Sequence, residues 1–262
     1  MKTILLLFIC LFVSMDSLSE EKDRPNIKYI DQPSTILLIG NSYLYYNNSL
    51  HNHLKRIVEE KVVGFDGSSS VKSSTIGGSR LKHHDVDRLI SPQSISKIQK
   101  FDLVILQGGS SESLSKKDRK EFAYHAKKHI NAINNIDSDA ALYMTHAYIR
   151  PHDRYVENQI DIINKTYTEV GNENNVLVIP VGLAFDLAYK EQPNIKLHDR
   201  DGTHPSLLGT YLAACTVFAS IYNQSPIGIE YDYFGSIEKS DKLFLQEIAH
   251  IATSKYLEIN LK

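Results

Sequence analysis

The sequence contains no tryptophan and only two cysteines among its 262 residues. Cys10 lies in an apolar run near the N-terminus, and the other cysteine is Cys215. Because the N-terminal run is expected to be removed, an intramolecular disulfide is excluded for the mature chain. Cys215 belongs to "YLAACTVFAS", an apolar pattern with helical spacing, so we predict that it is a buried core thiol.

The sequence also has no excess of basic or of acidic residues. The formal net charge is -2 and the pI is about 6.6. Such a balance gives no basic footprint for a nucleic-acid partner. After the N-terminal run, no segment is apolar enough to cross a membrane. Internal repeats, low-complexity tracts and a linker are not seen either, so the sequence predicts one large domain over residues 35–262.

The single long apolar run, residues 4–13, follows Met1-Lys2 and precedes small residues at Ser17 and Ser19. A basic start, an apolar centre and small residues before a cleavage site are typical of a secretory signal peptide. The run is shorter than the ~20 residues of a membrane helix. We therefore predict a signal peptide over 1–19, a polar lead-in over 20–34, and a secreted or periplasmic protein without stable membrane insertion after signal removal.

Short apolar segments alternate with segments of helical periodicity along the rest of the chain. Strands are expected at 35–39, 69–75, 101–107, 140–146 and 175–180. Helices are expected from Ser49 onward and at 81–90, 116–133, 155–170, 205–222 and 237–257. This alternation predicts an α/β fold, a three-layer αβα sandwich with a five-stranded, mainly parallel, flavodoxin-like sheet.

The first predicted strand ends in Gly40-Asn41-Ser42. A simple turn explains these residue types, since Gly, Asn and Ser are common in turns. Open α/β sheets also place their chemistry at the carboxyl ends of the strands. The stretch alone therefore allows either a turn or a serine hydroxyl presented at a reactive edge.

A second informative stretch is "DGTHPS", in which Asp201 precedes His204 by three residues. A carboxylate at that spacing can accept a hydrogen bond from the imidazole and fix its tautomer. Gly202 gives the backbone freedom that such a turn requires. The start of a capped helix would use the same residues, so this motif too has two explanations when taken alone.

Together, these stretches resemble the SGNH (GDSL-like) hydrolase superfamily, in particular a bacterial branch with Gly-Asn-Ser in its first block. The resemblance covers residues 35 to about 228. It implies that Ser42 is the nucleophile and that Asp201 and His204 complete a catalytic triad. "TIGGSRLKHH" (75–84) resembles the second block, whose glycine amide helps to bind the oxyanion; Gly78 fits best, with Gly77 as the alternative.

The third block departs from the family pattern. "DLVILQGGSSES" (102–113) lacks the family's asparagine, whose amide would serve the oxyanion hole. Ser111 takes that position if Gly109 is the glycine of the block. Gln107, at the end of the predicted strand, also carries N–H donors. We expect an oxyanion hole formed by Ser42, Gly78 and Gln107, with Ser111 as the alternative to Gln107.

The resemblance implies an esterase that removes an O-acetyl or short acyl group from a carbohydrate or another small alcohol, with no cofactor or metal. The departure in the third block favours a second hypothesis, a non-catalytic binding module for a carbohydrate or other ligand on the same fold. A nucleotide-binding protein is less consistent with the sequence, because "NSYLYYNNS" lacks the glycines of a phosphate loop. The sequence leaves the oligomeric state open.

Three tyrosines after Ser42 could form an aromatic wall of the site or could simply pack on the loop; they are Tyr43, Tyr45 and Tyr46. The paired histidines at 51, 53, 83 and 84 lack zinc-type spacing. The histidines of "THAYIRPHDR" (145–154) are likewise interpreted as packed or solvated side chains.

Overall fold

Five short strands form a single sheet in the computed structural model, which describes residues 24–262. All neighbouring strands are parallel, in the order β2-β1-β3-β4-β5. The strands are β1 (Ile36–Gly40), β2 (Val71–Thr75), β3 (Leu103–Gln107), β4 (Asp139–Tyr143) and β5 (Leu177–Ile179). This is the flavodoxin-like strand order, and it confirms the predicted fold class.

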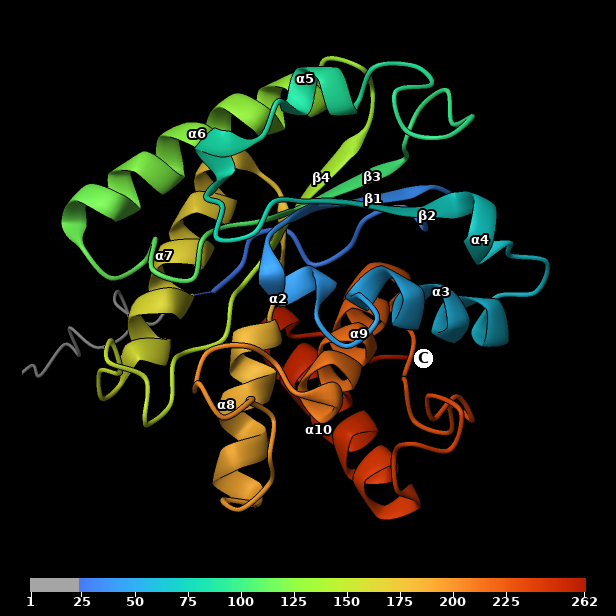
Figure 1. Cartoon of the computed structure of the whole chain (residues 1–262). Helices are drawn as coiled ribbons and strands as arrows, with labels where there is room; N and C mark the ends of the chain where they lie inside the picture. The colour runs from blue at the N-terminus through green and yellow to red at the C-terminus, as the bar shows by residue number, and fades with distance from the viewer. Residues whose placement is uncertain (1–23) are drawn as a thin grey trace, which may run out of the picture.

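Helices cover both faces of the sheet (Figure 1). One face carries α5 (Val86–Leu89), α6 (Lys116–Asn134) and α7 (Gln159–Asn174). The other carries α3 (Leu50–Lys61), α9 (Leu207–Tyr222) and α10 (Lys239–Leu257), with α8 (Val181–Glu191) packed against α9 and α10. The result is the expected three-layer sandwich.

The central strands and α9 form the middle of the core. Every residue of β1 and β3 is buried, as expected for strands covered on both faces. Helix α9 is buried along nearly its whole length, and the free thiol of Cys215 lies inside it, as predicted. Burial raises the pKa of that thiol to about 12, which keeps it protonated and unreactive.

Two helical segments differ from the prediction. The expected helix over 81–90 is divided into a 3₁₀ turn (Leu81–His83) and α5, because the carboxylate of Asp85 accepts the backbone N–H of Arg88 and starts a new helix there. Helix α7 begins only at Gln159, because Asn158 is in the left-handed conformation.

Helix α8 was not predicted at all. Pro180 precedes it and Gly182 lies in its first turn, and both residues usually indicate a break. Its buried positions include Val181, Ala184, Phe185 and Ala188, and few polar residues mark an outer face. Without a clear apolar stripe, the periodicity that identifies a surface helix is weak.

A short helix, α2 (Ser42–Tyr45), begins directly after β1. Asn41 is its N-cap, and the side-chain oxygen of Asn41 accepts the N–H of Tyr43 at 3.1 Å. The strand, the cap and the helix together fix Ser42 at the carboxyl edge of the sheet. A second short helix, α4 (Gly67–Ser70), leads into β2.

Residues 24–34, the described part of the expected lead-in, contain no helix or strand. They lie along the ends of α7 and α10, where the N–H of Asn26 reaches Asn172 and Lys28 pairs with Glu258 at 2.6 Å. The predicted signal peptide over 1–19 lies outside the described residues. Among residues 24–262, no helix combines the length and apolarity that a membrane span requires.

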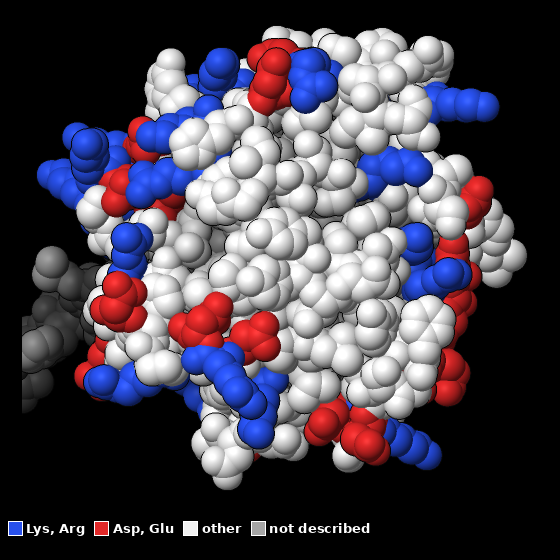
Figure 2. Space-filling view, in the orientation of Figure 1, with Lys and Arg blue, Asp and Glu red and all other residues white. Residues whose placement is uncertain are grey.

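Figure 2 shows basic and acidic side chains interspersed around a largely uncharged centre on the face that Figure 1 presents. This mixture of signs agrees with a net charge near zero.

Candidate active site

The three residues predicted as a triad lie in contact at the carboxyl edge of the sheet. His204 Nε2 is 2.9 Å from Ser42 Oγ, and His204 Nδ1 is 2.5 Å from Asp201 Oδ2. Ser42 comes from the start of α2, whereas the other two come from the turn before α9. This arrangement can transfer a proton from the serine hydroxyl to the imidazole.

The turn that carries Asp201 and His204 is held by its own backbone. Asp201 Oδ1 accepts the N–H groups of Thr203 and His204 at 2.9 and 3.0 Å. Gly202 has a φ of +72°, and a Cβ added there would lie 2.3 Å from the carbonyl oxygen of Ile149. Only glycine fits this position, because the neighbouring loop packs directly on the backbone of the turn.

Opposing effects act on the carboxyl of Asp201. Burial by itself raises its pKa, but hydrogen bonds from the His204 ring and from two backbone N–H groups lower it to about 2. Asp201 is therefore ionised at neutral pH. An ionised partner at Nδ1 keeps the proton of His204 on that nitrogen and leaves Nε2 free to accept one from Ser42.

Two aromatic side chains contact Thr203, in the turn between Asp201 and His204. The Tyr43 hydroxyl contacts Thr203 Oγ1 at 2.8 Å, and His146 Nε2 donates to the carbonyl oxygen of Thr203 at 2.8 Å. The His146 ring is stacked between Tyr43 and Phe185, with centroid separations of 4.1 and 4.4 Å. Burial lowers the pKa of His146 well below its usual value, so it is neutral.

His146 belongs to the stretch that the sequence suggested only as packed or solvated histidines. His146 lies just beyond the carboxyl end of β4, on the same edge of the sheet as Ser42, and this position was the available signal for its place beside the site.

A cavity of about 540 Å³ opens beside Ser42 and His204. Tyr45 and Tyr46 line it, and Tyr46 stacks on the His204 ring with a centroid separation of 4.1 Å. These two rings form the aromatic wall that the sequence suggested, whereas Tyr43 is almost completely buried beneath it. The other lining residues include Gly77, Gly78, Ser79, Arg80, Gly109, Ser110, Ser111, Tyr148, His152, Asp153, Arg154 and Thr203.

Two backbone amides in the lining of this cavity have no hydrogen-bond acceptor among the described residues. The N–H groups of Ser42 and Gly78 donate to no other residue within 24–262. Gly78 has a φ of +65°, a conformation that suits glycine, and it lies on the loop after β2. That loop is tied to the end of β1, because the N–H of Ile76 donates to the carbonyl oxygen of Gly40 at 3.0 Å.

Gln107 does not lie where its expected role requires. Its side chain is buried, and Oε1 accepts the N–H of Asn41 at 2.9 Å while Nε2 donates to the carbonyl oxygen of Gly108. The amide lies across Gly40, where an added Cβ would be 2.3 Å from Oε1. Gln107 does not line the cavity, so the geometry does not support it as an oxyanion donor.

Two serines of the third block do line the cavity. Ser111, the alternative from the sequence, accepts a long contact of 3.5 Å from Arg80. Ser110 was not considered in the sequence analysis; its hydroxyl oxygen accepts the Tyr148 hydroxyl at 2.9 Å. Strand β3 ends at Gln107, as the sequence predicted, so Ser110 and Ser111 both lie on the loop that follows it.

Comparison with solved structures shows which folds resemble this one. A DUF4886 family protein from Bacteroides uniformis superposes with a TM-score of 0.62 at 19% identity, covering 87% of this chain and 97% of its own. A putative SGNH hydrolase from Slackia heliotrinireducens superposes with a TM-score of 0.54 at 19% identity, covering 71% of this chain and 97% of its own. An acetyl xylan esterase gives a TM-score of 0.56 at 17% identity, covering 71% and 99%.

The chain has the SGNH-hydrolase fold. No family model and no curated protein sequence matches it. The ordered sequence blocks identified the SGNH fold correctly, although identity to its structural neighbours stays below 20%.

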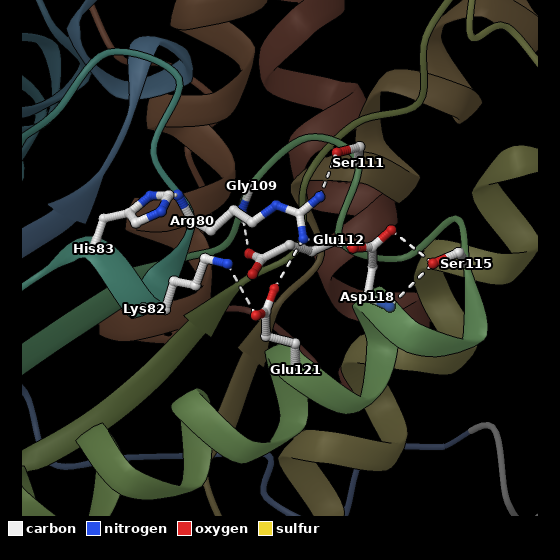
Figure 3. Close-up of polar contacts among 9 residues, drawn as sticks. All are labelled: Arg80, Lys82, His83, Gly109, Ser111, Glu112, Ser115, Asp118 and Glu121. Atoms are coloured by element: carbon white, nitrogen blue, oxygen red, sulfur yellow. Dashed lines mark hydrogen bonds and ion pairs between the residues drawn. The ribbon is translucent and has the colours of Figure 1, made fainter.

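A polar cluster lies next to the third-block loop of this SGNH fold (Figure 3). Arg80 pairs with Asp118 at 2.5 Å and with Glu121 at 3.0 Å, and so connects the second-block loop to α6. Glu112 is buried, and its Oε2 accepts the N–H of Gly109, while Oε1 has no hydrogen-bond partner among the described residues. Among these residues, no group of three or more His, Cys, Asp or Glu side chains is placed to hold a metal ion.

Burial raises the pKa of Glu112 from 4.5 to about 7, although the N–H of Gly109 and the charge of Arg80 oppose the rise. Because the folded-state pKa exceeds the unfolded value, the contribution of Glu112 to stability is fully present below about pH 4.5. It is lost as the pH rises to about 7. The loss amounts to roughly 3 kcal/mol, since each pKa unit corresponds to about 1.4 kcal/mol.

Glu112→Gln removes this titration and keeps an oxygen that can accept the Gly109 N–H. The wild type should lose roughly 3 kcal/mol of unfolding free energy between pH 4.5 and pH 8 through this titration, and Glu112→Gln should not. The difference in unfolding free energy, variant minus wild type, should therefore increase by that amount over this range. Urea unfolding at both pH values measures the change, with the exposed Glu157→Gln as the control. Equal pH dependence in wild type and Glu112→Gln would contradict the assignment.

Proposed function

We propose that the chain is a serine hydrolase that cleaves esters. The observation that carries the proposal is the continuous hydrogen-bonded series Ser42–His204–Asp201 beside an open cavity. A serine hydroxyl is a weak nucleophile until an adjacent base accepts its proton, and the imidazole of His204 lies at the distance this requires. The SGNH fold of the neighbours, some of which are named as esterases or lipases, agrees with the proposal.

The reaction follows from the positions of these three side chains. Ser42 Oγ attacks the ester carbonyl carbon while His204 Nε2 takes its proton. The tetrahedral intermediate then expels the alcohol, which receives that proton, and the acyl group remains on Ser42. Water, deprotonated by His204, attacks the acyl-enzyme and releases the acid, and Ser42 regains its proton.

Three donors are proposed for the oxyanion: the N–H groups of Ser42 and Gly78, and the hydroxyl of Ser110. Ser42, Gly78 and Ser110 all line the same cavity, which places the Ser110 hydroxyl on the same side as the two backbone amides. Because Tyr148 donates to Ser110 Oγ, the proton of Ser110 is available for the oxyanion.

Ser110→Ala is expected to lower kcat about 10- to 100-fold and to leave KM nearly unchanged, because the oxyanion exists only in the transition state and the intermediate. Ser111→Ala, which changes the adjacent residue in the same way, should alter kcat only a few-fold. Steady-state kinetics of both variants on an aryl acetate measure the difference. The reverse pattern would assign the third donor to Ser111.

For the substrate we propose a short acyl ester, with an acetylated carbohydrate as the preferred class. The cavity is polar at Ser79, Ser110 and Ser111 and has the tyrosine rings of its wall on one side, which suits a sugar ring better than a long acyl chain. A structural neighbour is named as an acetyl xylan esterase. We also propose export of the protein, on the basis of the signal-peptide pattern in residues 1–19.

The test is hydrolysis of aryl esters of increasing acyl length and of acetylated oligosaccharides, with release of the acid measured directly. We expect turnover that decreases as the acyl chain lengthens. Binding of an oligosaccharide without hydrolysis of any ester would support the non-catalytic binding module instead and would refute the proposed reaction.

A further inference from the structure

The side chain of Asn41 is buried at the point where the three sequence blocks of the site meet. It is 3% exposed. Its Nδ2 donates to the carbonyl oxygen of Ser79 at 3.0 Å and to that of Gly108 at 3.3 Å. Ser79 follows Gly78 on the second-block loop, and Gly108 opens the third-block loop.

The remaining polar atoms of Asn41 are also satisfied. Its Oδ1 accepts the N–H of Tyr43 and thereby caps α2, and its backbone N–H donates to Gln107 Oε1. One residue therefore connects the junction of β1 and α2, which carries Ser42, to both loops that would supply the other oxyanion donors. Each of these contacts is made without competition from water, because the side chain is buried.

We propose that Asn41 is the positioning residue that aligns the oxyanion donors with Ser42, and that its amide is the reason for Gly-Asn-Ser in place of Gly-Asp-Ser. This inference rests on the proposed function. An aspartate could still cap α2 through one oxygen. Its second oxygen would face two carbonyl oxygens at about 3 Å, where an amide places two protons.

The same contacts explain Gly40 and Gln107. Gln107 receives the N–H of Asn41 and donates to Gly108, so it extends the network that Asn41 forms instead of contacting substrate. Its amide occupies the space that a side chain at position 40 would need. In the motif, Gly40 leaves space for the Gln107 amide, the Asn41 amide binds both loops, and Ser42 supplies the hydroxyl.

Asn41→Asp is the decisive variant, because it changes one NH₂ group to an oxygen. We expect kcat on an aryl acetate to fall about 10- to 100-fold with KM changed less than about three-fold, since misaligned donors weaken transition-state binding and not substrate binding. Asn48→Asp is the matched control, because it makes the same change on an exposed side chain of the same segment.

Asn41→Ser covers the outcome in which Asn41→Asp fails to fold. Serine can also cap a helix, but it lacks the two amide donors, so the same loss of kcat is expected. Kinetics for either Asn41 variant that match those of Asn48→Asp would overturn the proposal.

Hydrogen exchange measured by mass spectrometry gives a readout that does not depend on turnover. In Asn41→Asp we expect faster exchange confined to residues 76–80 and 107–112, with the rest of the domain unchanged. If wild type hydrolyses no ester, the proposed function fails, yet unchanged exchange in these two segments would still overturn the positioning role and faster exchange would support it.

Discussion

Ser42→Ala is expected to lower kcat on an aryl acetate by about 10⁴-fold or more. The variant lacks the oxygen that forms the acyl-enzyme, and the 2.9 Å contact to His204 Nε2 disappears with it. The remaining oxyanion donors can still bind the ester and accelerate attack by water slightly, so a small residual rate is compatible with the mechanism.

Steady-state kinetics on purified Ser42→Ala measure this effect. The control is Ser68→Ala, which changes an exposed serine on α4 that does not line the cavity, and wild-type kinetics are expected for it. The near- and far-ultraviolet circular dichroism spectra of both variants should match those of wild type. Turnover by Ser42→Ala within ten-fold of wild type would show that another group is the nucleophile.

Asp201→Asn is expected to lower kcat by about 10³- to 10⁴-fold while the fold is retained. The amide oxygen can keep the two backbone N–H bonds that Asp201 Oδ1 accepts. The NH₂ group would then face His204 Nδ1 at the 2.5 Å contact, and it can only donate there. His204 must place its proton on Nε2, where it can no longer accept one from Ser42.

Asp153→Asn is the matched control for this variant. Asp153 is an exposed carboxylate that lines the same cavity and contacts His152 at 3.3 Å. The same change of charge there should alter kcat only a few-fold. Equal losses in both variants would mean that the overall charge of the cavity matters, and that Asp201 has no specific effect on the tautomer of His204.

The sequence predicted the sheet well because its signal is local. Strands β1 and β3 are uninterrupted apolar runs that end in polar residues, and this pattern is typical of buried parallel strands. Helix α8 escaped prediction for the opposite reason, because burial on most sides removes the contrast between an apolar and a polar face.

The site was only partly predictable. Ser42, Asp201 and His204 belong to short motifs, and the structure brings their side chains together. The direction of Gln107 could not be read from the sequence, because it depends on the empty space that Gly40 leaves on the neighbouring strand. The supporting position of His146 depends on its stacking between Tyr43 and Phe185, which are distant in the sequence.

The most direct test of the central claim is covalent labelling with a fluorophosphonate, which reacts far faster with an activated serine than with other side chains. Intact-mass analysis of wild type should show one adduct, and peptide mapping should place it on Ser42. The adduct should be absent from Ser42→Ala and strongly slowed in Asp201→Asn. An adduct on another residue, or equal labelling of Ser42→Ala, would contradict the account.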